Sequence, residues 1–164
     1  MKTILATIDF SATTPAIISE AAALARALDG RLILLHVIDK LPAASSEFDF
    51  VEASVRMKSA ATAESARELA RLQRQLARQG TTALTHHVVG DPGSAILEQV
   101  HAFGADYVVV GSRRHGSLYE LIIGGTAQRV IKEAPCPVLV VSADALRTDH
   151  ELPVREKYLN GARI

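Results

Sequence analysis

Short apolar runs alternate with longer amphipathic segments along this chain. Four runs are nearly continuous in hydrophobic, often β-branched residues, at positions 3–9, 31–38, 106–111 and 137–142, and a fifth run, 83–90, is less apolar. Nearly continuous hydrophobic strands are typical of a sheet covered on both faces, which is usually a parallel sheet. The pattern therefore predicts five parallel strands.

The segments between these strands have helical spacing of apolar residues. Helices are predicted over residues 11–28, 51–79, 92–103 and 126–133. Asp91 is the predicted N-cap of the third helix, because a short polar side chain at that position can accept a hydrogen bond from the first turn. Strands alternating with helices predict a three-layer α/β sandwich with right-handed crossovers.

Two segments lie outside this alternation. Residues 40–50, "KLPAASSEFDF", are predicted to form a loop because they contain proline and serine and lack an apolar period. Residues 143–164 are a polar stretch of mixed charge. We therefore expect one domain over residues 1–142, followed by a C-terminal tail over residues 143–164.

Composition narrows the possible partners and location. Lysine plus arginine equals aspartate plus glutamate at 18 each, so the chain lacks a global positive field for binding nucleic acid or anionic lipid. The apolar runs are too short to cross a bilayer. The single cysteine, Cys136, cannot form an internal disulfide, and the first residues do not resemble a signal peptide. We expect a cytoplasmic protein with neither nucleic acid nor membrane as a partner.

The candidate chemistry lies after the fourth strand, in "GSRRHGSLYELIIGGT". Ligands of open α/β sheets bind at the carboxyl ends of the strands. Gly111 would let the chain pass close to a ribose or phosphate, while Gly124, Gly125 and Thr126 would offer backbone N–H groups and a hydroxyl at the start of a helix. This arrangement favours an anion site, although turn geometry alone would also explain the glycines.

Two common phosphate-binding motifs are excluded. Gly111 and Gly116 have the glycine spacing of a Walker A loop, but Ser117 and Leu118 occupy the positions of its Lys-Ser/Thr pair. A dinucleotide fingerprint would follow the first strand, where "DFSATTP" contains no glycine.

Five segments resemble the universal stress protein family. They are "ILATIDFS", "LLHVID", "VGDPGSAIL", "GADYVVVGSRRHGSLYELIIGG" and "APCPVLVV", within residues 2–142. The resemblance implies a Rossmann-like sheet of strand order 3-2-1-4-5 and a nucleotide site between the first and fourth strands. It also implies a homodimer formed by antiparallel pairing of the fifth strands, here Val138 to Val141.

ATP-binding members of that family carry G-x2-G-x9-G-[S/T] after the fourth strand. Gly111 and Gly124 match this pattern, whereas Arg114 replaces the second glycine and Gly125 the final hydroxyl residue. Gly116 and Thr126, one or two positions away, would compensate, and the Arg114 guanidinium would bond a phosphate.

The resemblance also implies contacts at the nucleoside. Asp9 would meet the adenosine, although it could instead cap the first helix, and Val37 would lie beside the adenine edge. Thr7 replaces a proline that often precedes the aspartate. The predicted nucleotide site comprises Thr7, Ile8, Asp9, Val37, Val110, Gly111, Arg113, Arg114, Gly116, Gly124, Gly125 and Thr126.

The chain is thus expected to be a dimeric stress-response regulator that binds ATP or another adenine nucleotide, with Mg²⁺ or Mn²⁺ carried by the triphosphate, and acts on an unidentified protein partner. One alternative is a dimeric interaction protein of the same family that does not bind nucleotide, since two motif positions depart. The other is a slow nucleotide hydrolase. The sequence contains no recognisable nucleophile–base set and no spaced metal-ligand set, so neither catalytic nor metal-binding residues are assigned.

Overall fold

The sheet has the predicted number and order of strands. The computed structural model describes residues 1–39, 48–112 and 124–142. In order, they form β1 (Thr3–Thr7), α1 (Thr14–Ala27), β2 (Arg31–Asp39), α2 (Phe48–Arg78), β3 (Ala83–Gly90), α3 (Pro92–Phe103), β4 (Tyr107–Gly111), α4 (Gly125–Glu133) and β5 (Val138–Val141). Every paired strand is parallel to its neighbour, and the order is β3-β2-β1-β4-β5. The predicted α/β fold and the strand order are confirmed.

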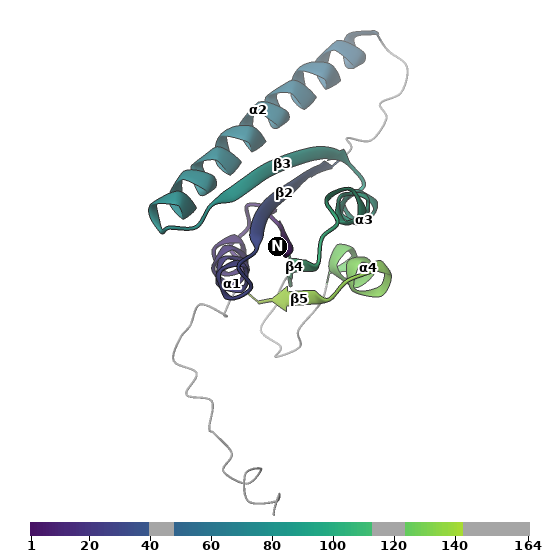
Figure 1. The fold of residues 1–164 in the computed structure, drawn as a ribbon. Helices are drawn as coiled ribbons and strands as arrows, with labels where there is room; N and C mark the ends of the chain where they lie inside the picture. The colour runs from purple at the N-terminus through teal and green to yellow at the C-terminus, as the bar shows by residue number, and fades with distance from the viewer. Residues whose placement is uncertain (40–47, 113–123, 143–164) are drawn as a thin grey trace, which may run out of the picture.

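Helices cover both faces of this sheet. α1 and α2 lie over one face, and α3 and α4 lie side by side over the other (Figure 1). The side chains of β1 alternate between these layers: Ile4 and Ala6 pack in the cluster that includes α1 and α2, whereas Leu5 packs with α3 and α4. Both faces of the central strand are therefore buried, which explains why its sequence is apolar at successive positions.

The direction of the chain across the sheet reverses beside β1. From β1 the chain proceeds to β2 and β3 on one side, and it then returns to place β4 and β5 on the other side. β1 pairs with β2 up to Thr7 and Leu35, and with β4 up to Ala6 and Val109. In open α/β sheets, such a reversal point leaves a crevice at the carboxyl ends of the strands.

Several predicted element ends are confirmed and others are wrong. Asp91 is the N-cap of α3 and its side chain accepts a hydrogen bond from Ser94 N at 3.0 Å. α3 ends at Gly104, which adopts a left-handed conformation with φ 56° that glycine tolerates well. The loop predicted over residues 40–50 is wrong at its end, because α2 already begins at Phe48.

The first strand is also shorter than predicted. β1 ends at Thr7, two residues before Asp9. The Asp9 side chain accepts a hydrogen bond from Ser11 N at 3.0 Å, and Phe10 has a positive φ of 56°. A side-chain bond to the backbone two residues later is typical of a turn, so the chain leaves the sheet here.

Candidate functional site

A cleft of about 450 Å³ opens at the reversal point of the sheet. Its walls come from the ends of β1, β2 and β4, from the β1–α1 turn, and from the first turns of α3 and α4. The lining residues from α3 are Pro92 and Ile96, and those from α4 include Ala127. Ile17 of α1 also lines it, so the cleft is built from six elements that the topology brings together.

Nine of the twelve residues predicted for the site line this cleft. They are Thr7, Ile8, Asp9, Val37, Val110, Gly111, Gly124, Gly125 and Thr126. The other three, Arg113, Arg114 and Gly116, lie outside the described residues. The structure thus brings the first-strand, second-strand and glycine-loop predictions into one cavity.

The β1–α1 turn forms one wall of the cleft. The Phe10 ring packs on the His36 ring with centroids 4.4 Å apart. His36 Nδ1 in turn donates a hydrogen bond to the carbonyl oxygen of Ile8 at 2.6 Å. These contacts tie the turn to β2, so Asp9 is held between two anchored neighbours.

Glycine has a different structural role at Gly111 than at Gly124 and Gly125, the other two described glycines of the predicted loop. A Cβ on Gly111 would lie 2.9 Å from Ile17 Cδ1 and 3.2 Å from Thr13 Cγ2. Glycine at this position therefore allows α1 to pack closely on β4. A Cβ on Gly124 or Gly125 would meet no described atom within 4 Å, so within the described chain, packing does not require glycine there.

Two of the helices that line the cleft, α3 and α4, begin differently. α3 is capped by its own carboxylate, since Asp91 Oδ1 accepts hydrogen bonds from Ser94 N and Ser94 Oγ. α4 begins after Gly124, whose position carries no side-chain cap hydrogen bond. The N–H groups of a helix's first turn have no partner within the helix and carry the positive end of its dipole. The start of α4 is consequently better suited to an anion than the start of α3.

Sequence reasoning missed several residues of the cleft. They are Ser11, Thr13, Ile17, Leu35, His36, Asp39, Pro92, Ile96, Ser112 and Ala127. Ser112 directly follows a predicted residue, and Asp39 is the last residue of β2, so adjacency to the strand ends could have found both. Ile17 and Ile96 are apolar positions of helices, and nothing in their local sequence distinguishes them from other core residues.

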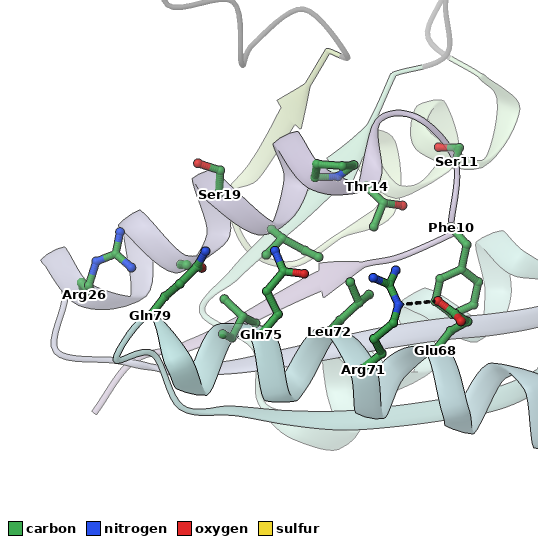
Figure 2. Close-up of a pocket in the computed structure, with 14 residues that line it drawn as sticks. Phe10, Ser11, Thr14, Ser19, Arg26, Glu68, Arg71, Leu72, Gln75 and Gln79 are labelled. Carbon is green, nitrogen blue, oxygen red and sulfur yellow. Dashed lines mark hydrogen bonds and ion pairs between the residues drawn. The ribbon is translucent and has the colours of Figure 1, made fainter.

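A second concavity lies between α1 and α2 (Figure 2). It has a volume of about 370 Å³, and its lining includes Leu72, Gln75 and the ion pair of Arg71 Nε with Glu68 Oε2 at 3.0 Å. Phe10 and Ser11 lie at one end of it, and Ser11 also lines the cleft. None of the nine predicted site residues that the structure describes lines this concavity.

The remaining chemistry is limited in the part of the chain that the structure describes. Cys136 is partly buried beside α3 and α4, and burial raises the pKa of its thiol above the usual 9.0. Within residues 1–39, 48–112 and 124–142, no three His, Cys, Asp or Glu side chains are grouped to hold a metal ion. No helix in these ranges is both long enough and apolar enough to span a bilayer.

Comparison with known proteins identifies close relatives of this chain. The model of the universal stress protein family matches residues 1–142. A universal stress protein of Thermus aquaticus, encoded in the 3' region of the QAH/OAS sulfhydrylase gene, is 34% identical over 140 residues, which are 85% of this chain and 98% of the relative.

Solved structures of universal stress proteins are also similar to this chain. The structure of MJ0577, a universal stress protein of Methanocaldococcus jannaschii, is 30% identical with a TM-score of 0.70, over 86% of this chain and 95% of that protein. UspA of Lactobacillus plantarum has the same fold at 23% identity, with a TM-score of 0.73 over 85% and 97% of the two chains.

Two further structures hold nucleotides. A universal stress protein in complex with cAMP has a TM-score of 0.63 at 23% identity, over 85% of this chain and 96% of that protein. The protein from Archaeoglobus fulgidus in complex with dAMP has a TM-score of 0.58 at 20% identity, over 86% and 98%.

Proposed function

This chain belongs to the universal stress protein family, and on that premise we propose that its cleft binds an adenine nucleotide, with ATP as the first candidate. The observation that carries the proposal is the position of the cleft. It lies at the reversal point of the sheet and joins the residues assigned to the nucleoside with those assigned to the phosphates.

The nucleoside lies against β1 and β2 in this proposal. Val37 and Ile8 provide apolar contacts for the base, and the Asp9 carboxylate accepts hydrogen bonds from the ribose or the base. Asp9 sits in the turn that Ser11 N and the Phe10–His36 ring contact stabilise. A carboxylate that is already held by the fold loses little conformational entropy when the ligand binds.

The phosphates lie against the start of α4. The backbone N–H groups from Gly125 onward meet the anion, and the Thr126 hydroxyl adds a donor. A divalent cation would arrive with the triphosphate. The cAMP and dAMP complexes of related proteins support the adenylate class, while the choice of ATP rests on the resemblance of the glycine loop to the ATP-binding members.

The dimer is a second part of the proposal. β5 is an edge strand of the sheet, and the Leu139 side chain is 39% exposed on it. An apolar edge strand is a template for pairing with a second copy. We propose a cytoplasmic homodimer joined along Val138–Val141, in which nucleotide occupancy changes a surface that a protein partner reads. Analytical ultracentrifugation of the wild type and Leu139→Lys tests this: the wild type should be a dimer and the variant a monomer.

The nucleotide is tested by two measurements on the full chain. Freshly purified protein is denatured and any released nucleotide is identified by chromatography. ATP and AMP with Mg²⁺ are then titrated by calorimetry into the wild type, Asp9→Ala and the control Glu68→Ala, whose carboxylate lies in the α1–α2 concavity instead of the cleft.

We expect ATP to bind the wild type and Glu68→Ala with similar affinity, and Asp9→Ala to bind it at least about tenfold more weakly, a loss of about 1.4 kcal/mol. The absence of both released nucleotide and binding heat in the wild type would refute the proposal. It would favour the interaction protein that does not bind nucleotide.

A further inference from the structure

An ion pair joins α3 and α4, two of the helices that begin at the cleft. Arg129 Nη1 of α4 donates a hydrogen bond to Asp91 Oδ1 at 2.9 Å. The same oxygen accepts from Ser94 N at 3.0 Å and from Ser94 Oγ at 2.7 Å, so the acceptor is the N-cap of α3. Arg129 thus connects α4 to the residue at which α3 begins.

α4 has few other attachments among the described residues. It contains nine residues, of which only Ala127 and Val130 are buried. Its N-cap, Gly124, supplies no side-chain hydrogen bond. Two buried side chains anchor α4 to the core but restrain its rotation only weakly. An additional contact can therefore decide where the first turn of α4 lies.

The Arg129 stem is also enclosed by the backbone of α3. Gly93 is buried, and a Cβ built on it would lie 2.8 Å from Arg129 Cδ. On the other side, Arg129 Nε lies 3.4 Å from Glu133 Oε2. The side chain is therefore held at its stem by Gly93, at its tip by Asp91 and at its flank by Glu133, although its exposed fraction is still 44%.

We propose that Arg129 is a positioning residue for the phosphate end of the cleft. By fixing α4 against the N-cap of α3, it sets the separation of the two helix starts and aims the N–H groups of Gly125 and Thr126 into the cleft. Arg129 does not line the cleft and touches no ligand in this proposal. The inference rests on the proposed nucleotide function and names what organises that site.

Three substitutions disturb this contact in different ways. Arg129→Ala removes the link, and Asp91→Asn removes its charge while keeping a side chain that can still cap α3. Gly93→Ala leaves both charged groups in place but forces the Arg129 stem away. Arg129→Lys keeps a positive charge and serves as the conservative variant. Glu68→Ala and Arg71→Ala are controls, since both residues line the α1–α2 concavity and neither contacts Arg129 or Asp91.

The readout compares ATP with adenosine, which lacks phosphates. Affinities are measured by calorimetry for ATP and by NMR chemical-shift titration for the weaker adenosine, after circular dichroism has verified folding. The three disturbing variants should bind ATP about fivefold more weakly, the change that corresponds to about 1 kcal/mol for a partly exposed ion pair. Their adenosine affinity should be unchanged, Arg129→Lys should recover most of the ATP affinity, and the controls should match the wild type.

The outcomes distinguish a failure of the proposed nucleotide function from a failure of the positioning role of Arg129. Wild-type protein that binds neither ATP nor adenosine refutes the proposed function and this inference with it. Wild-type protein that binds ATP, together with Arg129→Ala that binds it equally well, refutes the inference alone. An equal loss of ATP and adenosine affinity in Arg129→Ala also refutes it, because a general structural role would not distinguish the two ligands.

Discussion

Replacing the loop glycines one at a time should separate stability from binding. In Gly111→Ala, the new methyl group would lie 2.9 Å from Ile17 Cδ1 and 3.2 Å from Thr13 Cγ2. Ile17 is only 2% exposed, so its side chain is packed against the core and has to shift to accept the methyl group. Overpacking of this kind costs about 1–3 kcal/mol. With a middle value of about 2 kcal/mol and about 2–4 °C per kcal/mol for a domain of this size, Tm should fall by roughly 4–8 °C.

Gly125→Ala should behave in the opposite way. The added Cβ meets no described atom within 4 Å, and alanine favours a helix more than glycine does. Thermal stability should therefore be unchanged or slightly higher. In the proposed complex the methyl group would instead occupy the space through which the backbone approaches the phosphates, so ATP should bind at least about tenfold more weakly, or about 1.4 kcal/mol.

Differential scanning calorimetry gives Tm, and isothermal titration calorimetry gives the affinity for each variant. Gly124→Ala is the companion variant, since its Cβ also meets open space among the described residues. A Gly111→Ala protein that melts with the wild type would show that α1 can move away from β4. A Gly125→Ala protein that binds ATP normally would mean that the phosphates do not lie against α4.

Three further outcomes follow from the packing and the charges. Leu34 is fully buried, so Leu34→Ala should lower the unfolding free energy by about 2–5 kcal/mol in urea titrations, and a loss well below 1 kcal/mol would contradict its burial. The hydrogen bond from Lys2 and that from Thr3 N lower the pKa of Asp106 below 3.8. Its stabilising contribution is therefore present above the unfolded pKa and is lost as the pH falls through the lower folded value, so the advantage of the wild type over Asp106→Asn in urea should disappear in strong acid. Because burial raises the pKa of Cys136 above 9.0, iodoacetamide should alkylate it more slowly in the folded protein than in urea at pH about 8, and equal rates would refute this.

The sheet was predictable because its signal is repeated. Four of the five strands are apolar over successive positions, and both faces of β1 are indeed covered, in a cluster with Ile4 on one side and in a cluster with Leu5 on the other. The errors lie at element ends, where a single side chain decides the outcome. Asp9 bonds to Ser11 N and ends β1 early, and the apolar pattern of the strand carries no information about that bond.

Residues of the cleft were predictable where the family motif applies, as at Asp9 and Gly125, which both line it. The reason for each residue was less accessible. The sequence suggested that a ligand approaches Gly111 closely. In the structure, a Cβ at this position would instead meet Ile17 and Thr13, which are far away in the sequence. Arg129 and Asp91 are 38 positions apart and each belongs to an ordinary helical pattern. Only the packing of α4 beside α3 brings them together.

The strand order also constrains how the protein acquires its site during synthesis. β1, β2 and β3 are consecutive in the chain and adjacent in the sheet, so they can pair as soon as the first half has left the ribosome. The other edge of β1 pairs later in synthesis. Thr3 N, for example, donates a hydrogen bond to Asp106, which lies 103 positions further along the chain. Long-range parallel pairing of this kind is slow, and an unpaired apolar strand edge is prone to aggregation in the meantime.

Because the cleft lies between β1 and β4, it is completed only when the late half of the chain docks on the early half. A ligand of this cleft can therefore stabilise the finished fold. It cannot bind to a nascent chain in which only the first three strands have formed, because the cleft is then incomplete. Under the proposed function, a shortage of nucleotide would therefore not prevent assembly of the domain and would affect only the completed fold.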